Sequence, residues 1–174
     1  MRYFFDTEFI DAPPMIYPLS IGIIAEDERS YYAEFRHDEY VQHAGIWVRE
    51  NVLPKLTEAK KTPETIRDEL TTFIGREPEQ HHRRVESPEF WGWFPAYDWV
   101  IFCQLFGAMV DGLPWHWPNR PNDLVQWANH LGIARDALPE EPSGKHHAFA
   151  DAQWNYHVYQ FLADQARRLN DPFK

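Results

Sequence analysis

Apolar residues near the N-terminus come in short runs that polar residues interrupt, and this pattern predicts three strands. The first is the aromatic-rich segment Tyr3–Ile10, and the second is the apolar run Ile16–Ala25, which follows the break at Pro13-Pro14. The third is Ser30–Arg36. The acidic turn Glu26–Arg29 before it predicts that the second and third strands pair as a hairpin.

Farther along the chain, apolar residues recur at helical spacing instead. The segment Ile46–Ala59 has this spacing, although Pro54 should kink or divide it. Thr62-Pro63-Glu64 is a typical helix start and predicts a helix up to Ile74, before Gly75. The remaining predicted elements are the strand Glu89–Ala96, the helices Asp98–Met109, Asp123–Leu131 and Ala148–Leu169, and the loops Leu113–Pro121 and Pro139–Lys145.

This order of elements predicts the fold class. Strands come first, helices follow, a further strand lies mid-chain, and helices complete the chain, which is typical of a mixed α/β domain. A length of 174 residues suits one domain with a sizeable core, so we expect a single domain over residues 1–174.

Two acidic residues interrupt the first predicted strand. Asp6 and Glu8 lie two apart in a segment that is otherwise rich in Phe, Thr and Ile, so alternation places both carboxylates on one face. Two like charges so close would repel each other, and a divalent cation would remove that difficulty. An exposed edge strand with polar decoration is the alternative.

Two more acids lie on faces of helices that should be buried. At about 100° per residue, Phe102 and Leu105 lie about +40° and −20° from Asp98, so Asp98 heads the apolar stripe of its helix. The same arithmetic places Val158 and Leu162 about −20° and +20° from Asp151. An acid in the first turn of a helix is favoured by the macrodipole alone, but that does not explain why both acids face the core. A buried charge must be paired or bound to metal.

His146 lies five residues before Asp151 in a Gly-Lys-His-His segment. A histidine beside a cluster of carboxylates and metal could act as a general base at neutral pH. An ordinary surface histidine is the alternative, and the neighbouring His147 could exchange roles with His146.

Charge and composition limit the classes of partner. Acidic residues number 27 and basic residues 17, so the formal net charge is −10, which excludes broad binding along nucleic-acid phosphates. Cys103 is the single cysteine, which excludes an internal disulfide and a multi-cysteine zinc site. Acids near the N-terminus exclude a signal peptide, and no apolar run approaches the ~18 residues of a membrane span. We therefore expect a cytoplasmic protein with no membrane partner.

Three segments together resemble the motifs of the DEDDh exonucleases. They are Asp6-Thr7-Glu8, then Tyr97-Asp98 before an apolar helix, and His146-His147-Ala148-Phe149-Ala150-Asp151. The last segment matches the family pattern His-x-Ala-x-x-Asp in order and spacing. The DTEF opening and the short length are most similar to the small bacterial 3′-exoribonucleases of the RNase AS-like branch.

The resemblance implies an RNase H-like mixed sheet flanked by helices and a metal-dependent 3′–5′ exoribonuclease. Such an enzyme releases nucleoside 5′-monophosphates from the 3′ end of single-stranded RNA, with adenylate-rich RNA preferred. The four acids would hold two Mg²⁺ or Mn²⁺ ions, and His146 would accept a proton from the attacking water. The resemblance also implies a homodimer. Expected contacts to the substrate are the ribose contact Thr7, the base platforms Phe9 and Phe106, and the basic Lys145.

Two other functions remain open from the sequence. A DNA 3′–5′ exonuclease of the proofreading type would use the same residues with another sugar preference. A catalytically inactive RNase H-like module would only bind nucleic acid or a protein. The complete set of four acids argues against the inactive module, because a buried acid is costly without a metal.

Overall fold

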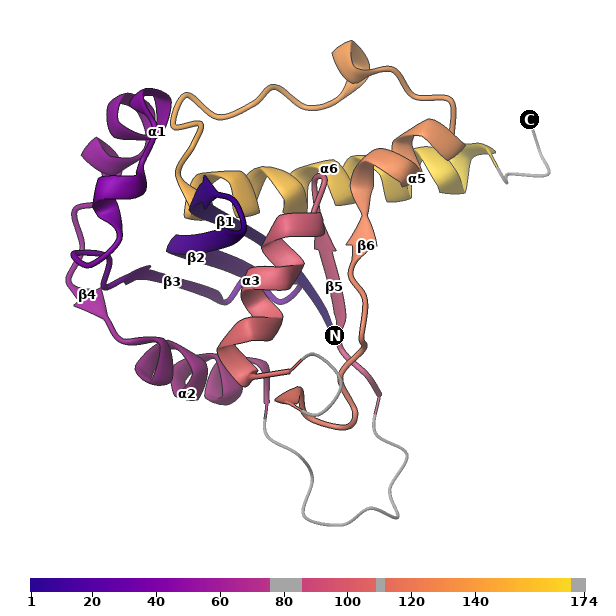
Figure 1. Ribbon diagram of the computed structural model, residues 1–174. Coiled ribbons are helices and arrows are strands. Elements are labelled where there is room, and N and C mark those ends of the chain that lie inside the picture. The colour runs from indigo at the N-terminus through magenta and orange to yellow at the C-terminus, as the bar shows by residue number, and fades with distance from the viewer. Residues whose placement is uncertain (76–85, 109–111, 170–174) are drawn as a thin grey trace.

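The computed structural model describes residues 1–75, 86–108 and 112–169, and these residues form a mixed six-stranded sheet with flanking helices (Figure 1). The strand order is β4-β3-β2-β1-β5-β6. β1 pairs antiparallel with β2 and β2 with β3, whereas β5 runs parallel to β1, β6 parallel to β5, and β4 parallel to β3. The strands are β1 Arg2–Ala12, β2 Met15–Ala25, β3 Ser30–Phe35, β4 Lys60–Lys61, β5 Glu89–Gly92 and β6 Asn122–Asp123.

Helices cover both faces of this sheet. Residues of β1 point alternately to the two faces, so Phe5 packs against Trp99 and Phe102 of α3, while Phe4 packs against Tyr156 of α6. The long α6 crosses one face with α5 beside it, and α3 lies on the other (Figure 1). The helices are α1 Ile46–Asn51, α2 Pro63–Ile74, α3 Ala96–Phe106, α5 Leu124–His130 and α6 Ala148–Leu169, with 3₁₀ turns at Val41–His43, Leu53–Lys55 and Arg135–Ala137.

Most predicted elements are confirmed, including the hairpin of β2 and β3 and the full length of α6. Pro54 does divide its segment, because α1 ends at Asn51 and a 3₁₀ turn follows. The helix predicted after Thr62 is α2, and the Thr62 side chain caps it by accepting a hydrogen bond from the Thr65 N–H.

The mid-chain strand and helix differ from the prediction. β5 ends at Gly92, and α3 begins at Ala96, two residues before the expected Asp98. The chain turns sharply between them, with Phe94 at φ 53° and Pro95 as the residue before the helix. The helix ends at Phe106, next to Gly107 at φ 106°, and Met109 lies outside the described residues. The apolar run therefore contains a turn that its hydrophobicity does not reveal.

In the described part of the chain, no helix combines the length and apolarity needed to cross a membrane. α6 has 22 residues, and its buried residues, which include Ala152, Asn155 and Val158, lie on the side that packs on the sheet. It is therefore a surface helix that stabilises the sheet.

Candidate functional site

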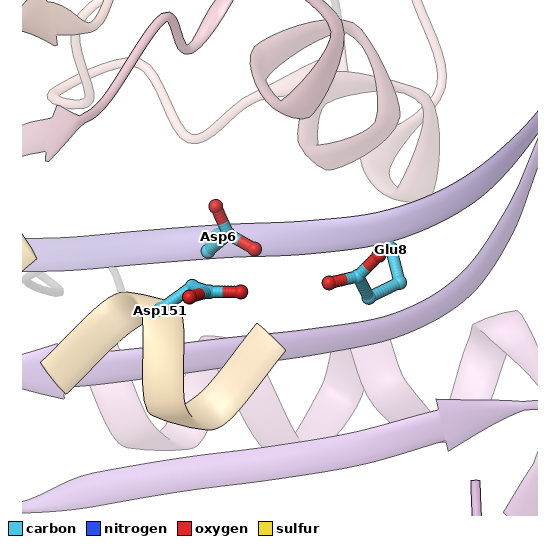
Figure 2. Close-up of side chains that lie close together, drawn as sticks. All are labelled: Asp6, Glu8 and Asp151. Atoms are coloured by element: carbon cyan, nitrogen blue, oxygen red, sulfur yellow. The ribbon is translucent and has the colours of Figure 1, made fainter. Parts of the chain in front are cut away.

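Three carboxylates converge on the face of the sheet that α6 covers (Figure 2). Asp6 and Glu8 come from β1, where residues two apart share a face, and Asp151 comes from the first turn of α6. One carboxylate oxygen from each of these side chains lies within 4.8 Å of those of the other two. Residues 143 positions apart in the sequence are thus close enough to share one cation.

Asp98 joins the same region from the start of α3 and is 8% exposed. Its Oδ1 accepts hydrogen bonds from the Thr7 N–H (2.8 Å) and from the Thr7 hydroxyl (2.6 Å). Thr7 is the residue between Asp6 and Glu8, so these two bonds attach the fourth acid directly to the strand that carries the first two. The prediction that Asp98 heads a buried helix face is confirmed, because Phe102, one turn on, is fully buried.

The position of Asp151 depends on a glycine in β2. Gly22 is the antiparallel partner of Asp6, and a Cβ added at Gly22 would lie 2.4 Å from the Ala148 carbonyl oxygen. Only a residue without a side chain lets the first turn of α6 approach the sheet so closely. This contact sets the distance between Asp151 and β1.

Burial and mutual repulsion raise the pKa values of these acids. Burial raises the pKa of Asp6 well above its usual value, and the charges of the other three acids, Asp98 foremost, raise it further. Burial, together with the charges of Asp151 and Asp98, raises the pKa of Glu8 to about 8. Burial also raises the pKa of Asp98 and of Asp151, although hydrogen bonds to both carboxylates oppose the rise. All four pKa values are raised because the acids have too little positive charge nearby to stabilise their ionised forms.

Lys55 supplies part of that positive charge. Its ammonium lowers the pKa of both Glu8 and Asp151, against the larger effect of burial. The same ammonium donates a hydrogen bond to the Lys145 carbonyl oxygen. Lys55 thus connects the 3₁₀ turn that contains Pro54 to the loop that precedes α6.

The two histidines before α6 have different surroundings. His146 has φ 63°, lines a pocket with Asp6 and Asp151, and packs edge-on against Trp47 with ring centroids 4.6 Å apart. The His147 ring instead stacks on Tyr32 at 4.7 Å. The backbone N–H groups of both residues donate to Asp151 Oδ2, at 2.8 Å and 3.3 Å respectively. Of the two side chains, it is therefore that of His146 that borders the pocket.

The pocket beside the acids has a volume of about 250 Å³. One wall comes from the loop before α6, where Glu141 forms ion pairs with both Arg135 and Lys145. The Arg135 guanidinium in turn lies 4.4 Å from the centroid of the Trp93 ring. These contacts fix the loop at the site, and Lys145 lies on the pocket wall as a partner of Glu141.

The predicted substrate contacts fall into different places. Phe9 is half-buried next to the acids along β1, and its ring stacks on that of Tyr97 at 5.5 Å, with Tyr97 48% exposed. Thr7 is buried, and its hydroxyl is used on Asp98. Phe106 lies at the far end of α3 from Asp98 and packs on Phe102 and Trp117, so the structure does not bring it to the acids.

The sequence prediction did not include three residues that shape the site: Gly22, Lys55 and Asn155. An isolated glycine in an apolar strand is a known sign of close backbone approach, and Gly22 fits that rule. Asn155 lies four residues after Asp151 and hence on the same helix face, so the helical phase used for Asp151 would also have found it. No local pattern points to Lys55, because it reaches the acids only through the tertiary fold.

A mixed α/β sheet with four acids gathered from β1, α3 and α6 is the arrangement expected of an RNase H-like exonuclease, and the class that fold and site indicate is 3′–5′ exonuclease. A family model described as the Rv2179c-like 3′-5′ exoribonuclease domain matches residues 1–163. Two curated relatives from Mycobacterium tuberculosis are each 38% identical to this chain over 157 residues, which cover 88% of this chain and 88% of the relative. They are the 3′-5′ exoribonuclease Rv2179c of strain H37Rv and the 3′-5′ exoribonuclease MT2234.1 of strain CDC 1551. The chain belongs to the Rv2179c-like 3′-5′ exoribonuclease domain family, and it is a hydrolase of the 3′–5′ exonuclease class.

Proposed function

We propose that this protein is a metal-dependent exoribonuclease that removes nucleoside 5′-monophosphates from the 3′ end of single-stranded RNA. The observation that carries the proposal is the convergence of Asp6, Glu8 and Asp151 within 4.8 Å, in a member of an exoribonuclease family. Like charges at such distances need a counter-charge, and nuclease chemistry has a use for one.

The donor set suits hard divalent cations. All four acids offer carboxylate oxygens, which Mg²⁺ and Mn²⁺ prefer, and the raised pKa of Glu8 indicates that the cluster favours any added positive charge. We propose that Asp6, Glu8, Asp98 and Asp151 hold two such ions. When bound, the ions lower the pKa of a water and stabilise charge on the leaving 3′ oxygen.

His146 is the proposed general base. It borders the pocket that Asp6 and Asp151 line, where it can take the proton of the attacking water. The Asp151 carboxylate receives the N–H groups of residues 146 and 147 and thereby orients the loop that carries the base. His147 is held against Tyr32, which leaves the role of base to its neighbour.

Thr7 and Phe9 complete the proposed site. Thr7 donates two hydrogen bonds that orient Asp98, and this is the main role that we assign to Thr7. The ribose contact is its second proposed role. The Phe9 and Tyr97 rings offer a platform on which the terminal base can stack, worth about 1–3 kcal/mol per base. A site that reads the ribose 2′-OH would select RNA over DNA.

A direct assay tests the proposal. We expect purified protein to shorten 5′-labelled RNA from its 3′ end with Mg²⁺ or Mn²⁺, and we expect EDTA to abolish this. Asp6→Asn and Asp151→Asn should each lose at least 10²-fold in rate, whereas Asp11→Asn, an exposed acid on the same strand, should keep wild-type rate. Full activity of Asp6→Asn would contradict the proposal.

Substrate choice is decided by parallel reactions on poly(A), RNA of mixed sequence and single-stranded DNA. Faster digestion of poly(A) than of mixed RNA would support the preference for adenylate. Equal rates on RNA and DNA would favour the alternative of a proofreading-type exonuclease. No cleavage of any of them, with binding retained, would favour the inactive binding module.

A further inference from the structure

Asn155 links the two elements that carry the acids. It lies on α6 one turn after Asp151, is 1% exposed, and donates a hydrogen bond from Nδ2 to the Phe5 carbonyl oxygen at 2.9 Å. Phe5 immediately precedes Asp6 on β1. The amide nitrogen is therefore fully explained as a tie between strand and helix.

The amide oxygen has no such explanation. Asn155 Oδ1 has no hydrogen-bond partner among residues 1–75, 86–108 and 112–169, although the atom is buried. A buried acceptor without a donor is costly, and native proteins usually satisfy it with protein or ordered water. Asn155 also lines the pocket of about 250 Å³ that Asp6 and Asp151 line, which has room for several waters.

The neighbours in that pocket restrict what the donor can be. In the metal-bound site that we propose, the carboxylates of Asp6 and Asp151 are ionised and are acceptors only, so they cannot donate to Asn155 Oδ1. Arg135 and Lys145, the cations on the same pocket wall, are paired with Glu141. A water molecule can donate to the amide oxygen and to a carboxylate at once. Mg²⁺ and Mn²⁺ bound by carboxylates usually retain several waters, whose protons need acceptors.

We propose that Asn155 is a positioning residue of the site, whose Oδ1 accepts a hydrogen bond from a hydration water of the cation that Asp6 and Asp151 hold. The inference rests on the proposed metal-dependent function and adds a residue to it. Asn155 does not touch the cation. Its Oδ1 fixes one water, whereas the bond from Nδ2 to Phe5 is a separate structural contact. Outer partners of this kind typically change metal affinity by about 10–100-fold.

The test measures Mn²⁺ binding in the absence of RNA, by titration calorimetry and by the rise in melting temperature. Asn155→Leu removes both polar atoms and should weaken Mn²⁺ binding by about 10–100-fold. Asn155→Asp keeps an acceptor oxygen but loses the donor to Phe5, so it should bind Mn²⁺ at least as tightly as wild type. Val158→Ala, a buried truncation one turn farther along α6, should destabilise the protein without changing Mn²⁺ affinity.

The outcomes separate the inference from the proposed function. Unchanged Mn²⁺ affinity in Asn155→Leu overturns the inference, and so does an equal loss in Asn155→Leu and Asn155→Asp, because the bond to Phe5 would then explain both. If Asn155→Leu does not fold by circular dichroism, Asn155→Ala replaces it in the same comparison. A wild-type protein that binds no Mn²⁺ overturns the proposed function itself.

Discussion

At the scale of single residues, His146 and His147 show how far a motif can determine chemistry. Both are compatible with a general base by residue type, and the motif favours His146 by spacing alone. The surroundings separate them physically, because the ring of His146 borders the acid-lined pocket whereas that of His147 stacks on Tyr32. The assignment then predicts different kinetics for the two variants.

We expect His146→Ala to lose about 10²–10⁴-fold in kcat, the usual contribution of a general base. His147→Ala should lose less than about tenfold, because it removes a stacking contact and leaves the backbone N–H that holds Asp151. The measurement is kcat at saturating RNA and fixed Mn²⁺, with the exposed His157→Ala as a control. If His147→Ala is the inactive variant, the base is wrongly assigned.

The burial of the acids was predictable from sequence, but their hydrogen bonds were not. Helical phase places Asp98 on the buried side because Phe102, one turn on, is apolar, and that inference needs no tertiary information. The role of Thr7 differs, since its hydroxyl could face ribose, water or protein. Only the tertiary approach of α3 to β1 brings the Asp98 carboxylate to the Thr7 hydroxyl, which donates to it.

At the scale of elements, long periodic segments were predicted well and short ones were not. α6 and the first three strands carry enough repeats for their period to be clear. β4 and β6 have two residues each and exist because they pair with β3 and β5, so nothing in their own sequence marks them as strands. The close packing of α6 on β2 is also tertiary, although the isolated Gly22 in an apolar strand is a sign of it.

That close packing predicts the effect of Gly22→Ala. The added methyl would meet the Ala148 carbonyl oxygen at 2.4 Å and the Phe149 Cα at 2.6 Å, so the first turn of α6 must move. We expect a loss of about 1–3 kcal/mol in the free energy of unfolding, measured in urea, with loss of most activity as Asp151 is displaced. Gly45→Ala is the matched control, because a Cβ there has no atom within 4 Å. A Gly22→Ala protein with wild-type stability and activity would contradict this account of the site.

At the scale of the whole molecule, a net charge of −10 restricts how an RNA can bind. An acidic surface repels a polyphosphate, so attraction has to be local, and the proposed site offers it through the cations that we propose on the four acids and through stacking on Phe9 and Tyr97. Two bound divalent cations would reduce the negative charge by four. We therefore infer that the same cations serve both binding and chemistry, and the charge of the cluster then governs the stability of the metal-free protein.

That charge gives a pH dependence with a definite sign. The pKa of Glu8 is about 8 in the folded protein, against 4.5 for an ordinary glutamate, so the folded state keeps a proton that the unfolded state has released. Between about pH 4.5 and 8 the folded state therefore binds more protons, and each unit of rising pH lowers its stability by at most about 1.4 kcal/mol per such group. The raised pKa of Asp6 acts in the same direction.

We expect the melting temperature in EDTA to fall between pH 5 and 8, more in wild type than in Glu8→Gln, which has no such proton to lose. Added Mn²⁺ should raise the melting temperature most at pH 8, where the carboxylates are ionised and repel one another. A metal-free protein whose stability rises across this range would show that the acids are not held together as an unbalanced cluster.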